Sequence, residues 1–428
     1  MRLVHLTPGT GTFHCGSCLR DNALVKALRA RGHDAIIAPL YLPMVTDADE
    51  AAENQPVRAG GIVLYLLQKF PPFRFAPTWL RNFLNEEHRL RSASKHMGMT
   101  SARDLGEMTT GSLLGEKGRQ WPEWARLVDW IVDEVKPDAI SLSNSLLMGL
   151  APALMKRAGV PVVCSLQGED AFLDTLIEPY RTQSWHLMKE NAKSITRFVA
   201  PSRFYADVMA PRLGVNADAV RVVHNGINSD AYLRERIEPE APTIGYLARM
   251  IHGKGLATLV DAFIALAARD TVPGVRLRIA GAKTPEDENY VEGLRLKLSA
   301  AGLLARVTFE PNLTFEEKVK FLNELTVFSV PATYGEAFGL YVIEAQACAI
   351  PVVQPRHGAF PEILAKTQGG VLCEPDSVPA LANALEELLL KPTHLRQLSE
   401  VGKFHARAHF SASRMAERFE TVLNEVVK

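Results

Sequence analysis

Two cations in the second half of the chain have the spacing of an anion-binding loop. Arg249 and Lys254 stand five residues apart, between a predicted strand at 243–247 and a helix that begins after Gly255. Arginine, lysine and the amino end of a helix all attract phosphate groups. The pattern predicts that both cations and the start of the helix face one anionic group. The alternative is two unrelated surface cations in a loop.

Two carboxylates follow a later predicted strand. Glu336 lies in a glycine-rich turn, and Glu344 lies about a turn and a half into the next helix, among apolar neighbours. A carboxylate in such surroundings needs a partner. A ribose diol held by both carboxylate oxygens would supply one, and a salt bridge is the alternative. The backbone amides of 338–340 are expected to bind a phosphate or a sugar.

The elements that must position these groups alternate along the chain. Apolar runs of strand length alternate with amphipathic segments of helix length, and the order strand, helix, strand at 3–40 predicts a parallel sheet. In the first half, the expected strands are 3–7, 35–40, 62–67, 139–142, 160–166, 197–200 and 220–224. In the second half, they are 243–247, 275–280, 307–310, 327–330, 351–354 and 370–373.

The chain is long enough for two domains, each with its own core. The polar, proline-bearing segment 235–242 is interpreted as the linker. We therefore expect an α/β protein with two doubly wound, Rossmann-like domains facing a cleft. The domains are 1–235, with an irregular insertion at about 41–118, and 236–410. A terminal helix, 411–428, completes the chain.

Several motifs together resemble one enzyme family. They are Gly245 with Arg249, Lys254 and Gly255; the segment 336–340 with Glu344; 223–228; 277–281; and Gly358 with Pro361 and Glu362. The sequence is similar to the retaining glycosyltransferases of group 1 (family 4), which have the GT-B fold. The resemblance covers nearly all of the second domain, and it implies that the terminal helix, 411–428, crosses back onto the first domain.

The resemblance implies a nucleotide-diphosphate sugar as donor, bound by the second domain. Arg249 and Lys254 would neutralise the diphosphate leaving group, Glu336 would bind the donor sugar, and Glu344 would bind the ribose. The donor would also contact Ala337, Phe338, Gly339 and Leu340. No metal is needed for that charge neutralisation, and no further cofactor is implied. Transfer would proceed with retention of configuration.

The first domain is expected to bind the acceptor. Its opening glycine-rich loop offers Gly11 and Gly16 as further donor contacts, although a plain tight turn explains them as well. At the end of the strand 160–166 the family has a histidine, and this sequence has Gln167. Gln167, Glu169 and Asp170 are the candidates for contact with sugar or acceptor. For the two acids, charge placement at a helix start is the alternative.

Other cysteine and acidic motifs favour no metal site. Cys15 and Cys18 form a C-x-x-C pattern at a helix start, but no second such pair or histidine pair accompanies it, which favours small structural residues. Asp47 and Asp49 are interpreted as a solvated acidic turn. The odd number of cysteines, five, favours a reducing compartment.

Charge and hydropathy restrict the partners. The 48 basic and 48 acidic residues cancel, so no overall field attracts nucleic acid. With neither a signal peptide nor a membrane span in the sequence, we expect a soluble, cytoplasmic protein. The aromatic segment 70–83 is expected to pack over the first domain. Contact with a lipid-linked acceptor or with the inner face of a membrane is the alternative.

The predicted activity is transfer of a hexosyl group from a UDP- or GDP-sugar to a hydroxyl of a sugar, glycolipid or small molecule. The alternatives are an isomerase of the UDP-sugar 2-epimerase kind, which shares the two-domain fold, and a nucleotide-sugar-binding protein without catalysis. The presence of Lys254 and Glu336 weighs against the last.

Overall fold

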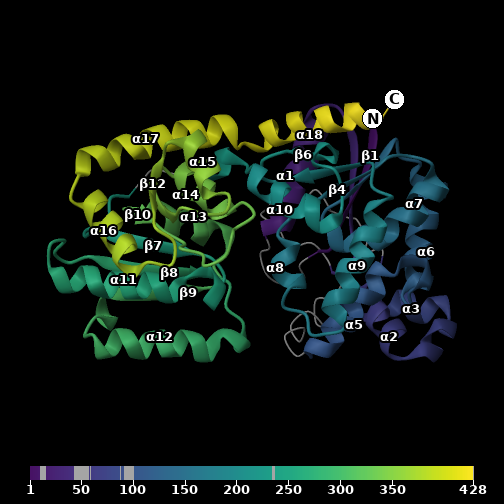
Figure 1. Cartoon of the computed structure of the whole chain (residues 1–428), viewed down its shortest axis with the longest axis horizontal. Coiled ribbons are helices and arrows are strands. Elements are labelled where there is room, and N and C mark those ends of the chain that lie inside the picture. Colours follow the sequence, from purple (N-terminus) through teal and green to yellow (C-terminus); the bar gives the residue numbers. More distant parts are fainter. Residues whose placement is uncertain are drawn as a thin grey trace. The chain divides into compact units, whose positions relative to one another are not determined.

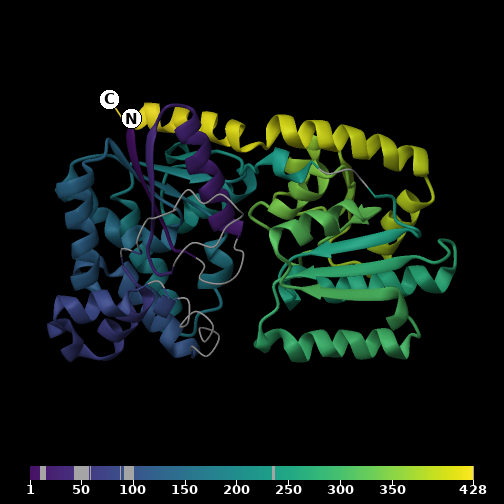
Figure 2. The same ribbon diagram turned by 180° about the vertical axis from the view of Figure 1, so that it is seen from behind.

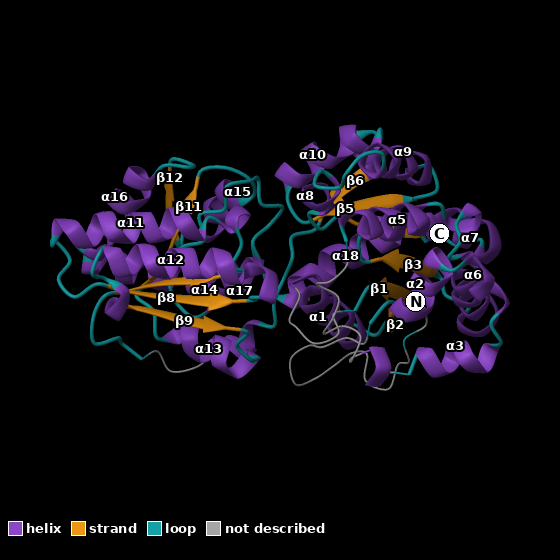
Figure 3. Ribbon diagram, turned by 90° about the horizontal axis from the view of Figure 1, so that it is seen from below, coloured by secondary structure: helices purple, strands orange, loops and turns teal. Residues whose placement is uncertain are grey.

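The computed structural model describes residues 1–9, 16–42, 57, 59–86, 88–90, 101–233 and 237–427. The chain divides into two compact units, Met1–His224 with Met415–Lys428, and Asn225–Arg414. The described residues form one six-stranded sheet in each unit, and all strand pairs are parallel. Figure 3 shows the strands of each unit flanked by helices, which is the doubly wound α/β arrangement expected from the sequence.

The first unit has the strand order β2-β1-β3-β4-β5-β6, and Figure 3 labels all of these strands except β4. Its strands are β1 (Arg2–Thr7), β2 (Asp34–Pro39), β3 (Ala139–Leu142), β4 (Val162–Ser165), β5 (Arg197–Ala200) and β6 (Val220–Val222). Its α-helices are α1 (Gly16–Ala30), α2 (Gly61–Lys69), α3 (Thr78–Leu84), α5 (Ala102–Leu113), α6 (Trp121–Asp129), α7 (Ala151–Ala158), α8 (Glu169–Leu173), α9 (Tyr180–Ala192), α10 (Arg203–Leu213) and α18 (Ala412–Val426). Shorter helical segments are η1 (Pro71–Phe75), η3 (Gly115–Lys117), η4 (Trp130–Val135), η5 (Ser145–Leu150) and η6 (Ala217–Ala219).

The C-terminal helix α18 begins in the second unit and packs, from Met415 onward, in the core of the first. Met415, Phe419 and Leu423 are buried together with Leu3 of β1 and Leu24 of α1. Figure 2 shows α18, in yellow, over the purple β1 and α1. Apolar residues four apart place one face of α18 against the sheet, which anchors the end of the chain.

The second unit has the strand order β12-β11-β10-β7-β8-β9. Its strands are β7 (Thr243–Leu247), β8 (Arg276–Gly281), β9 (Val307–Pro311), β10 (Val327–Phe328), β11 (Val352–Pro355) and β12 (Gly370–Cys373). Its α-helices are α11 (Leu256–Arg269), α12 (Glu288–Ala300), α13 (Phe315–Asn323), α14 (Leu340–Ala347), α15 (Phe360–Thr367), α16 (Val378–Leu389) and α17 (Pro392–His409). Shorter helical segments are η7 (Ser229–Tyr232), η8 (His252–Lys254), η9 (Pro285–Asp287) and η10 (Leu304–Arg306).

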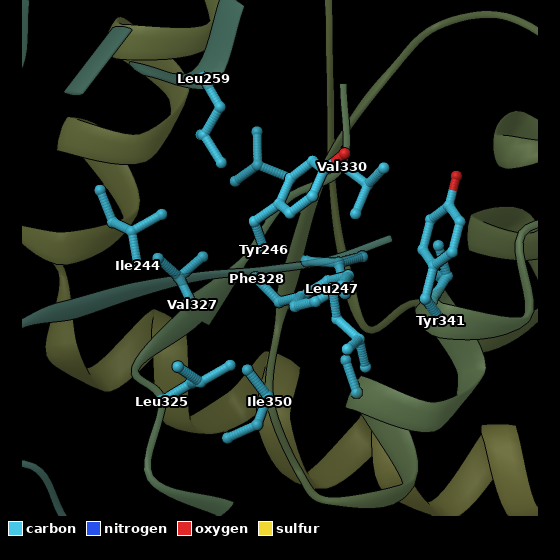
Figure 4. Packing of buried hydrophobic residues seen from close by; sticks show 14 of the residues in the cluster. Ile244, Tyr246, Leu247, Leu259, Leu325, Val327, Phe328, Val330, Tyr341 and Ile350 are labelled. Carbon is cyan, nitrogen blue, oxygen red and sulfur yellow. The ribbon is translucent and has the colours of Figure 1, made fainter. Parts of the chain in front are cut away.

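The core of the second unit lies on both faces of its sheet. Helix α11 contacts α12 and α16, whereas α17 contacts α14 and α15. In Figures 1 and 2, α12 and α17 lie on opposite sides of the strands. Figure 4 shows Tyr246 of β7 and Phe328 of β10 in the packed interior, with Tyr341 of α14 beside them. Because both faces are covered, β7, β10 and β11 are buried at every position, whereas β8 and β9 are buried at only some of theirs.

The expected strand at 62–67 is wrong. These residues belong to α2, and Val63, Leu64 and Leu67 are the buried ones. Positions i, i+1 and i+4 share one side of a helix but not one face of a strand. Apolar and polar residues do not alternate in this run, so its pattern did not distinguish a helix from a strand. The expected irregular insertion is likewise largely helical where it is described, in α2, η1, α3 and α5.

The boundary between the units lies between His224 and Asn225, before the expected position at 235. Two contacts explain the difference. Ile227 exchanges backbone hydrogen bonds with Phe410 and Ala412, and Tyr232 is buried in the second core. Residues 235 and 236 of the expected linker lie outside the described residues.

The aromatic segment 70–83 packs over the first unit only in part: Arg81 is buried and η1 and α3 contact α2, but three aromatic side chains are exposed. Phe70, Phe75 and Trp79 are 59%, 76% and 69% exposed. In the part of the chain that the structure describes, no helix is both long and apolar enough to cross a bilayer.

Candidate functional site

Two of the predicted donor residues, Lys254 and Glu336, lie at one edge of the second sheet together with Gly358. The loop after β7 carries Lys254, the turn after β10 carries Glu336, and the turn after β11 carries Gly358. Strands β11, β10 and β7 are neighbours and parallel, so their carboxyl ends meet at the same edge. Ligands of doubly wound sheets bind at this edge.

Lys254 and Glu336 form an ion pair at the centre of this edge. The Lys254 ammonium contacts Oε2 of Glu336, and both side chains are largely buried, at 16% and 13% exposure. The Tyr341 hydroxyl donates to the same oxygen at 3.0 Å, and the Tyr334 hydroxyl donates to it at 3.4 Å. The ammonium also lies 5.0 Å from the centre of the Tyr334 ring. Lysine and carboxylate are therefore held in one arrangement.

The same contacts fix the charge state of the lysine. Burial alone would lower the pKa of Lys254, but the Glu336 carboxylate and Tyr334 raise it above its usual value. Burial, with the Glu336 charge, raises the pKa of Tyr341 well above its usual value, so this hydroxyl keeps its proton and donates. The site thus presents a fixed cation at neutral pH.

Two glycines allow the loops of the site to approach each other. Gly255 has φ +71°, and a Cβ there would lie 1.7 Å from the carbonyl oxygen of Pro331. Gly358 has φ +60°, and its Cβ would lie 2.6 Å from the amide nitrogen of Glu336. No side chain fits at either place. The loop after β7 and the turns after β10 and β11 are therefore in direct backbone contact.

The turn after β10 leads directly into α14. Ala337 and Phe338 are buried, and Gly339, with φ +86°, precedes the first helical residue, Leu340. No side chain caps this helix end, so its first amides point outward, as the first amides of any helix do. Glu336 and the start of α14 thus lie together, as the sequence predicted.

Glu344 lies within α14 and is 6% exposed. Its Oε1 accepts from the Tyr232 hydroxyl at 2.7 Å and from the Lys318 ammonium at 3.1 Å. The partner that a buried carboxylate requires is thus present in this chain, and both partners were missed in the sequence. Lys318 lies at the fourth position of α13, where the pattern indicates only a charged helix surface.

Arg249 does not join the Lys254–Glu336 pair among the described contacts. Its side chain is about half exposed, and the guanidinium lies 3.6 Å from the carboxylate of Asp287. The Tyr246 hydroxyl donates to its backbone carbonyl at 3.0 Å. Its backbone is therefore anchored while its side chain is accessible.

In the first unit, Gln167, Glu169 and Asp170 lie after β4. Glu169 is buried and accepts from the backbone amides of Ser145 and Gln167, at 2.8 and 2.7 Å. Tyr205 donates to Glu169 at 3.1 Å and to Asp170 at 2.8 Å. Burial raises the pKa of Glu169, although the amides oppose the shift. The carboxylate of Glu169 therefore links the segment that follows β3, at Ser145, to the loop that follows β4, at Gln167. The Gln167 side-chain nitrogen is buried and has no acceptor among the described residues.

A buried polar cluster in the first unit was not predicted. Asp21 of α1 accepts from Thr7 at 2.8 Å, from Ser143 at 2.5 Å and from Arg20 at 2.6 Å, and its Oδ1 lies 3.1 Å from Nε2 of His5. All of these groups lie at or near the carboxyl ends of β1 and β3. A signal was present, because Asp21 shares the helix face of Cys18, Val25 and Leu28.

Other predicted residues are placed more simply. Gly16 is the first residue of α1, whereas Gly11, Cys15, Asp47 and Asp49 lie outside the described residues. Cys18 is buried. Among the described side chains, no group of three or more histidine, cysteine, aspartate or glutamate residues has the geometry to hold a metal ion.

Two models of known protein families match this chain. The family model described as glycosyl transferases group 1 matches residues 233–404, and the model described as glycosyltransferase family 4 matches residues 104–231. The chain is a group 1 glycosyltransferase. The first match contains Lys254, Glu336 and Glu344, and the second contains the segment 167–170.

Relatives of this glycosyltransferase cover most of its length. It is 24% identical over 400 residues to the glycogen synthase of Mycobacterium tuberculosis, across 90% of this chain and 85% of the relative. It is 25% identical over 375 residues to a GDP-mannose-dependent phosphatidylinositol monomannoside mannosyltransferase of Mycolicibacterium smegmatis, across 82% of this chain and 91% of that one.

A solved structure shows the same fold. The crystal structure of HepE from Anabaena in complex with UDP matches with a TM-score of 0.68 and 17% identity, across 99% of this chain and all of that chain. The glycosyltransferase therefore has the GT-B fold, with two Rossmann-like domains.

Proposed function

We propose that this glycosyltransferase transfers a hexosyl group from a UDP- or GDP-sugar to a hydroxyl of a carbohydrate, glycolipid or small-molecule acceptor, with retention of configuration and without a metal. The observation that carries the proposal is the ion pair of Lys254 with Glu336 beside the uncapped start of α14. One edge of one sheet thus offers a cation, a carboxylate and backbone amides, which are the groups needed for a diphosphate joined to a sugar.

The proposed chemistry follows from these charges. As the bond between the anomeric carbon and the diphosphate breaks, negative charge grows on the leaving oxygen. Lys254, with Arg249 brought in from its accessible position, neutralises that charge and lowers the barrier. The acceptor hydroxyl attacks the anomeric carbon on the face that the diphosphate leaves, and its proton passes to the departing phosphate. Glu336 holds a sugar hydroxyl.

The role of Gln167 in this proposal is binding. A side-chain amide is no general base, but the buried nitrogen of Gln167 has a hydrogen to donate and no acceptor among the described residues. A hydroxyl of the donor sugar or the acceptor would satisfy it. Glu169 is proposed to support this loop, since its oxygens already accept from Ser145 and Gln167.

Both nucleotide classes stay in the proposal because the relatives differ. The mannosyltransferase relative is named as GDP-mannose-dependent, and HepE was solved with UDP and with UDP-glucose.

A thermal-shift panel of UDP, GDP, ADP and their sugar conjugates tests the donor class. A ligand at about 100 times its Kd adds about 2.7 kcal/mol to the stability of the folded state. We expect one base to raise the Tm, and the absence of a shift with every nucleotide would contradict the proposal.

An isomerase of the 2-epimerase kind would also bind a nucleotide sugar. The two activities differ in their products, because transfer releases the nucleoside diphosphate together with a glycosylated acceptor, whereas epimerisation returns a nucleotide sugar. Chromatography of the reaction with the sugar conjugate selected by the thermal-shift panel therefore distinguishes them. Transfer predicts free nucleoside diphosphate in proportion to the glycoside formed.

We further propose that the segment 65–83 of the first unit contacts a lipid membrane surface. Five of the six exposed aromatic side chains among the described residues lie in this segment: Tyr65, Phe70, Phe75, Trp79 and Phe83, the sixth being Phe404. The Arg74 guanidinium lies 4.6 Å from the centre of the Phe75 ring, and that of Arg89 lies 3.5 Å from the Phe83 ring. Exposed aromatic rings with neighbouring cations suit the headgroup region of an anionic bilayer.

A further inference from the structure

Glu344 is held by two residues from elements outside its own helix. Tyr232 comes from η7 and Lys318 from α13, whereas Glu344 lies in α14. The Lys318 ammonium and the Tyr232 hydroxyl both reach Oε1 of Glu344, and they lie 3.0 Å from each other. Three groups distant in sequence therefore form one triangle of hydrogen bonds.

The triangle is buried. Tyr232 is 4% exposed, Glu344 is 6% exposed, and the Lys318 side chain is 13% exposed. The Phe315 ring covers this triangle. Its centre lies 4.8 Å from the Lys318 ammonium and 5.5 Å from the centre of the Tyr232 ring, which it contacts edge to face. A carboxylate in such a place is costly unless a cation compensates it, and Lys318 supplies that charge.

The two oxygens of Glu344 are used unequally. Both described bonds go to Oε1, and no described residue donates a hydrogen bond to Oε2. A carboxylate oxygen accepts from two donors readily, so Oε1 is saturated by the chain itself. Oε2 is left as the acceptor for hydroxyl groups of a ligand, with its direction fixed by the bonds at Oε1.

We propose that Lys318 and Tyr232 are positioning residues that hold the Glu344 carboxylate for the ribose of the donor. They thereby make the site select ribonucleotides over deoxyribonucleotides. The inference rests on the proposed nucleotide-sugar donor, with Glu344 as the ligand of its ribose, as expected from the sequence. Neither residue touches the ligand. Lys318 compensates the charge of the carboxylate and holds its Oε1, and Tyr232 fixes its rotation, so the loss of either weakens only the contact to the sugar hydroxyls.

The test compares binding of UDP and GDP with binding of their 2′-deoxy and 3′-deoxy forms by calorimetry. The variants are Lys318→Met, which keeps the length of the side chain, and Tyr232→Phe, which keeps the ring. Lys320→Met is the matched control, because Lys320 lies on the same helix, is 66% exposed and is 3.9 Å from the carboxylate of Glu324, away from Glu344. Circular dichroism verifies that each variant is folded.

We expect the wild-type protein to bind one ribonucleotide about tenfold or more tightly than at least one of its deoxy forms, because a hydrogen bond to a charged group is lost. Lys318→Met should bring this ratio close to one by weakening only the ribonucleotide, and Tyr232→Phe should lower it in part. Lys320→Met should keep the wild-type ratio. A role in stability alone would lower the affinity for all forms equally.

The outcomes separate the two proposals. If the wild-type protein binds neither UDP nor GDP, the donor assignment fails, and the positioning role fails with it. If the wild-type protein prefers the ribonucleotide and folded Lys318→Met keeps the same preference, the positioning role alone is wrong.

Discussion

Lys254 and Glu336, 82 residues apart in sequence, are each other's charge partner at the edge of the second sheet. Each is also a proposed donor ligand, so the donor cannot engage one without affecting the other. The pair compensates its own burial before any ligand binds, and Tyr341 holds the carboxylate in place at 3.0 Å. A bound diphosphate would be a second anion beside Lys254. With the Lys254 ammonium shared between the two anions, Glu336 could accept a hydrogen bond from a sugar hydroxyl.

Removal of the cation should therefore affect transfer far more than folding. We expect Lys254→Met to lower kcat/KM for the donor by about a hundredfold or more, because one fixed charge that stabilises the leaving group is lost. Initial rates of nucleoside diphosphate release measure the effect. Glu336→Gln should also reduce transfer, since it removes the carboxylate that orients both the lysine and the sugar.

The control for this prediction is Lys297→Met on α12. Lys297 is half exposed and pairs with Asp261, away from the strand ends that carry the site. Its loss should change kcat/KM by less than about threefold, because exposed ion pairs contribute little. If folded Lys254→Met also stayed within that range, the map of the donor site would be wrong.

The loop that carries Lys254 depends on Gly255. Gly255→Ala and Gly274→Ala both place a side chain at φ +71°, but a Cβ at Gly274 meets nothing within 4 Å, whereas at Gly255 it meets the Pro331 carbonyl oxygen. We expect Gly274→Ala to cost about 1 kcal/mol for the left-handed backbone. Gly255→Ala should cost about 2 kcal/mol more, because overpacking adds to the strain.

Urea denaturation measures both glycine variants, and the difference between them isolates the close contact. Gly255→Ala should also weaken nucleotide binding, because its loop shifts away from Pro331. Equal losses of stability and unchanged binding in both variants would show that the approach of the two loops does not matter for the site.

The alternation of apolar runs predicted most of the fold. Strands such as 3–7 and 243–247 are buried on both faces, and a continuous apolar run of that length between turn signals leaves few alternatives. The run at 62–67 failed because it is equally apolar but packs as a helix with one buried side. Only tertiary contacts separate the two structures there, since the spacing of its apolar residues fits both.

The proximity of Lys254 and Glu336 could be predicted because the proposed donor residues follow strand ends within short motifs. Lys254, Glu336 and Glu344 each lie close to a glycine turn that the sequence displays. Tyr232, Lys318 and Tyr341 carry no such signal, since their roles arise from distances across elements. The same holds for Asp21, whose partners His5, Thr7 and Ser143 come from two strands.

The Asp21 cluster makes the stability of the protein depend on acid pH. Burial alone would raise the pKa of Asp21, but His5, Arg20 and Ser143 lower it well below its ordinary value of 3.8. A lowered pKa in the folded state contributes stability above pH 3.8, which is lost progressively as the pH falls below that value. At neutral pH, Asp21→Asn should cost about 3–5 kcal/mol, because Arg20 is then buried without its anion.

Urea unfolding of the wild type and of Asp21→Asn between neutral pH and pH 3 tests the Asp21 prediction. The difference in unfolding free energy should be constant near neutral pH and should shrink below pH 3.8. Asp34→Asn, at a half-exposed aspartate beside Arg2 in the same unit, is the control and should show a small difference. A constant difference down to the lowest pH would contradict the role given to Asp21.

Metal removal distinguishes charge neutralisation by side chains from neutralisation by a bound cation. Because Lys254 and Arg249 are proposed to meet the diphosphate, transfer should survive dialysis against EDTA with its rate unchanged. The assay is product formation before and after dialysis, with manganese or magnesium added back in parallel. Activity that disappears on dialysis and returns with manganese would overturn the proposed mechanism.

The exposed aromatic segment of the first unit should bind lipid vesicles. We expect the wild-type protein to sediment with vesicles that contain phosphatidylglycerol, and to bind phosphatidylcholine vesicles more weakly, since Arg74 and Arg89 add an electrostatic contribution. The double variant Phe75→Ser with Trp79→Ser should weaken vesicle binding by about tenfold or more. Each of these rings would move from water into the bilayer on binding, and the variant loses that favourable transfer free energy. Phe404→Ser is the matched control, since Phe404 is 69% exposed in the other unit. Vesicle binding that falls equally in the control, or that persists in the double variant, would show that this segment does not meet the membrane.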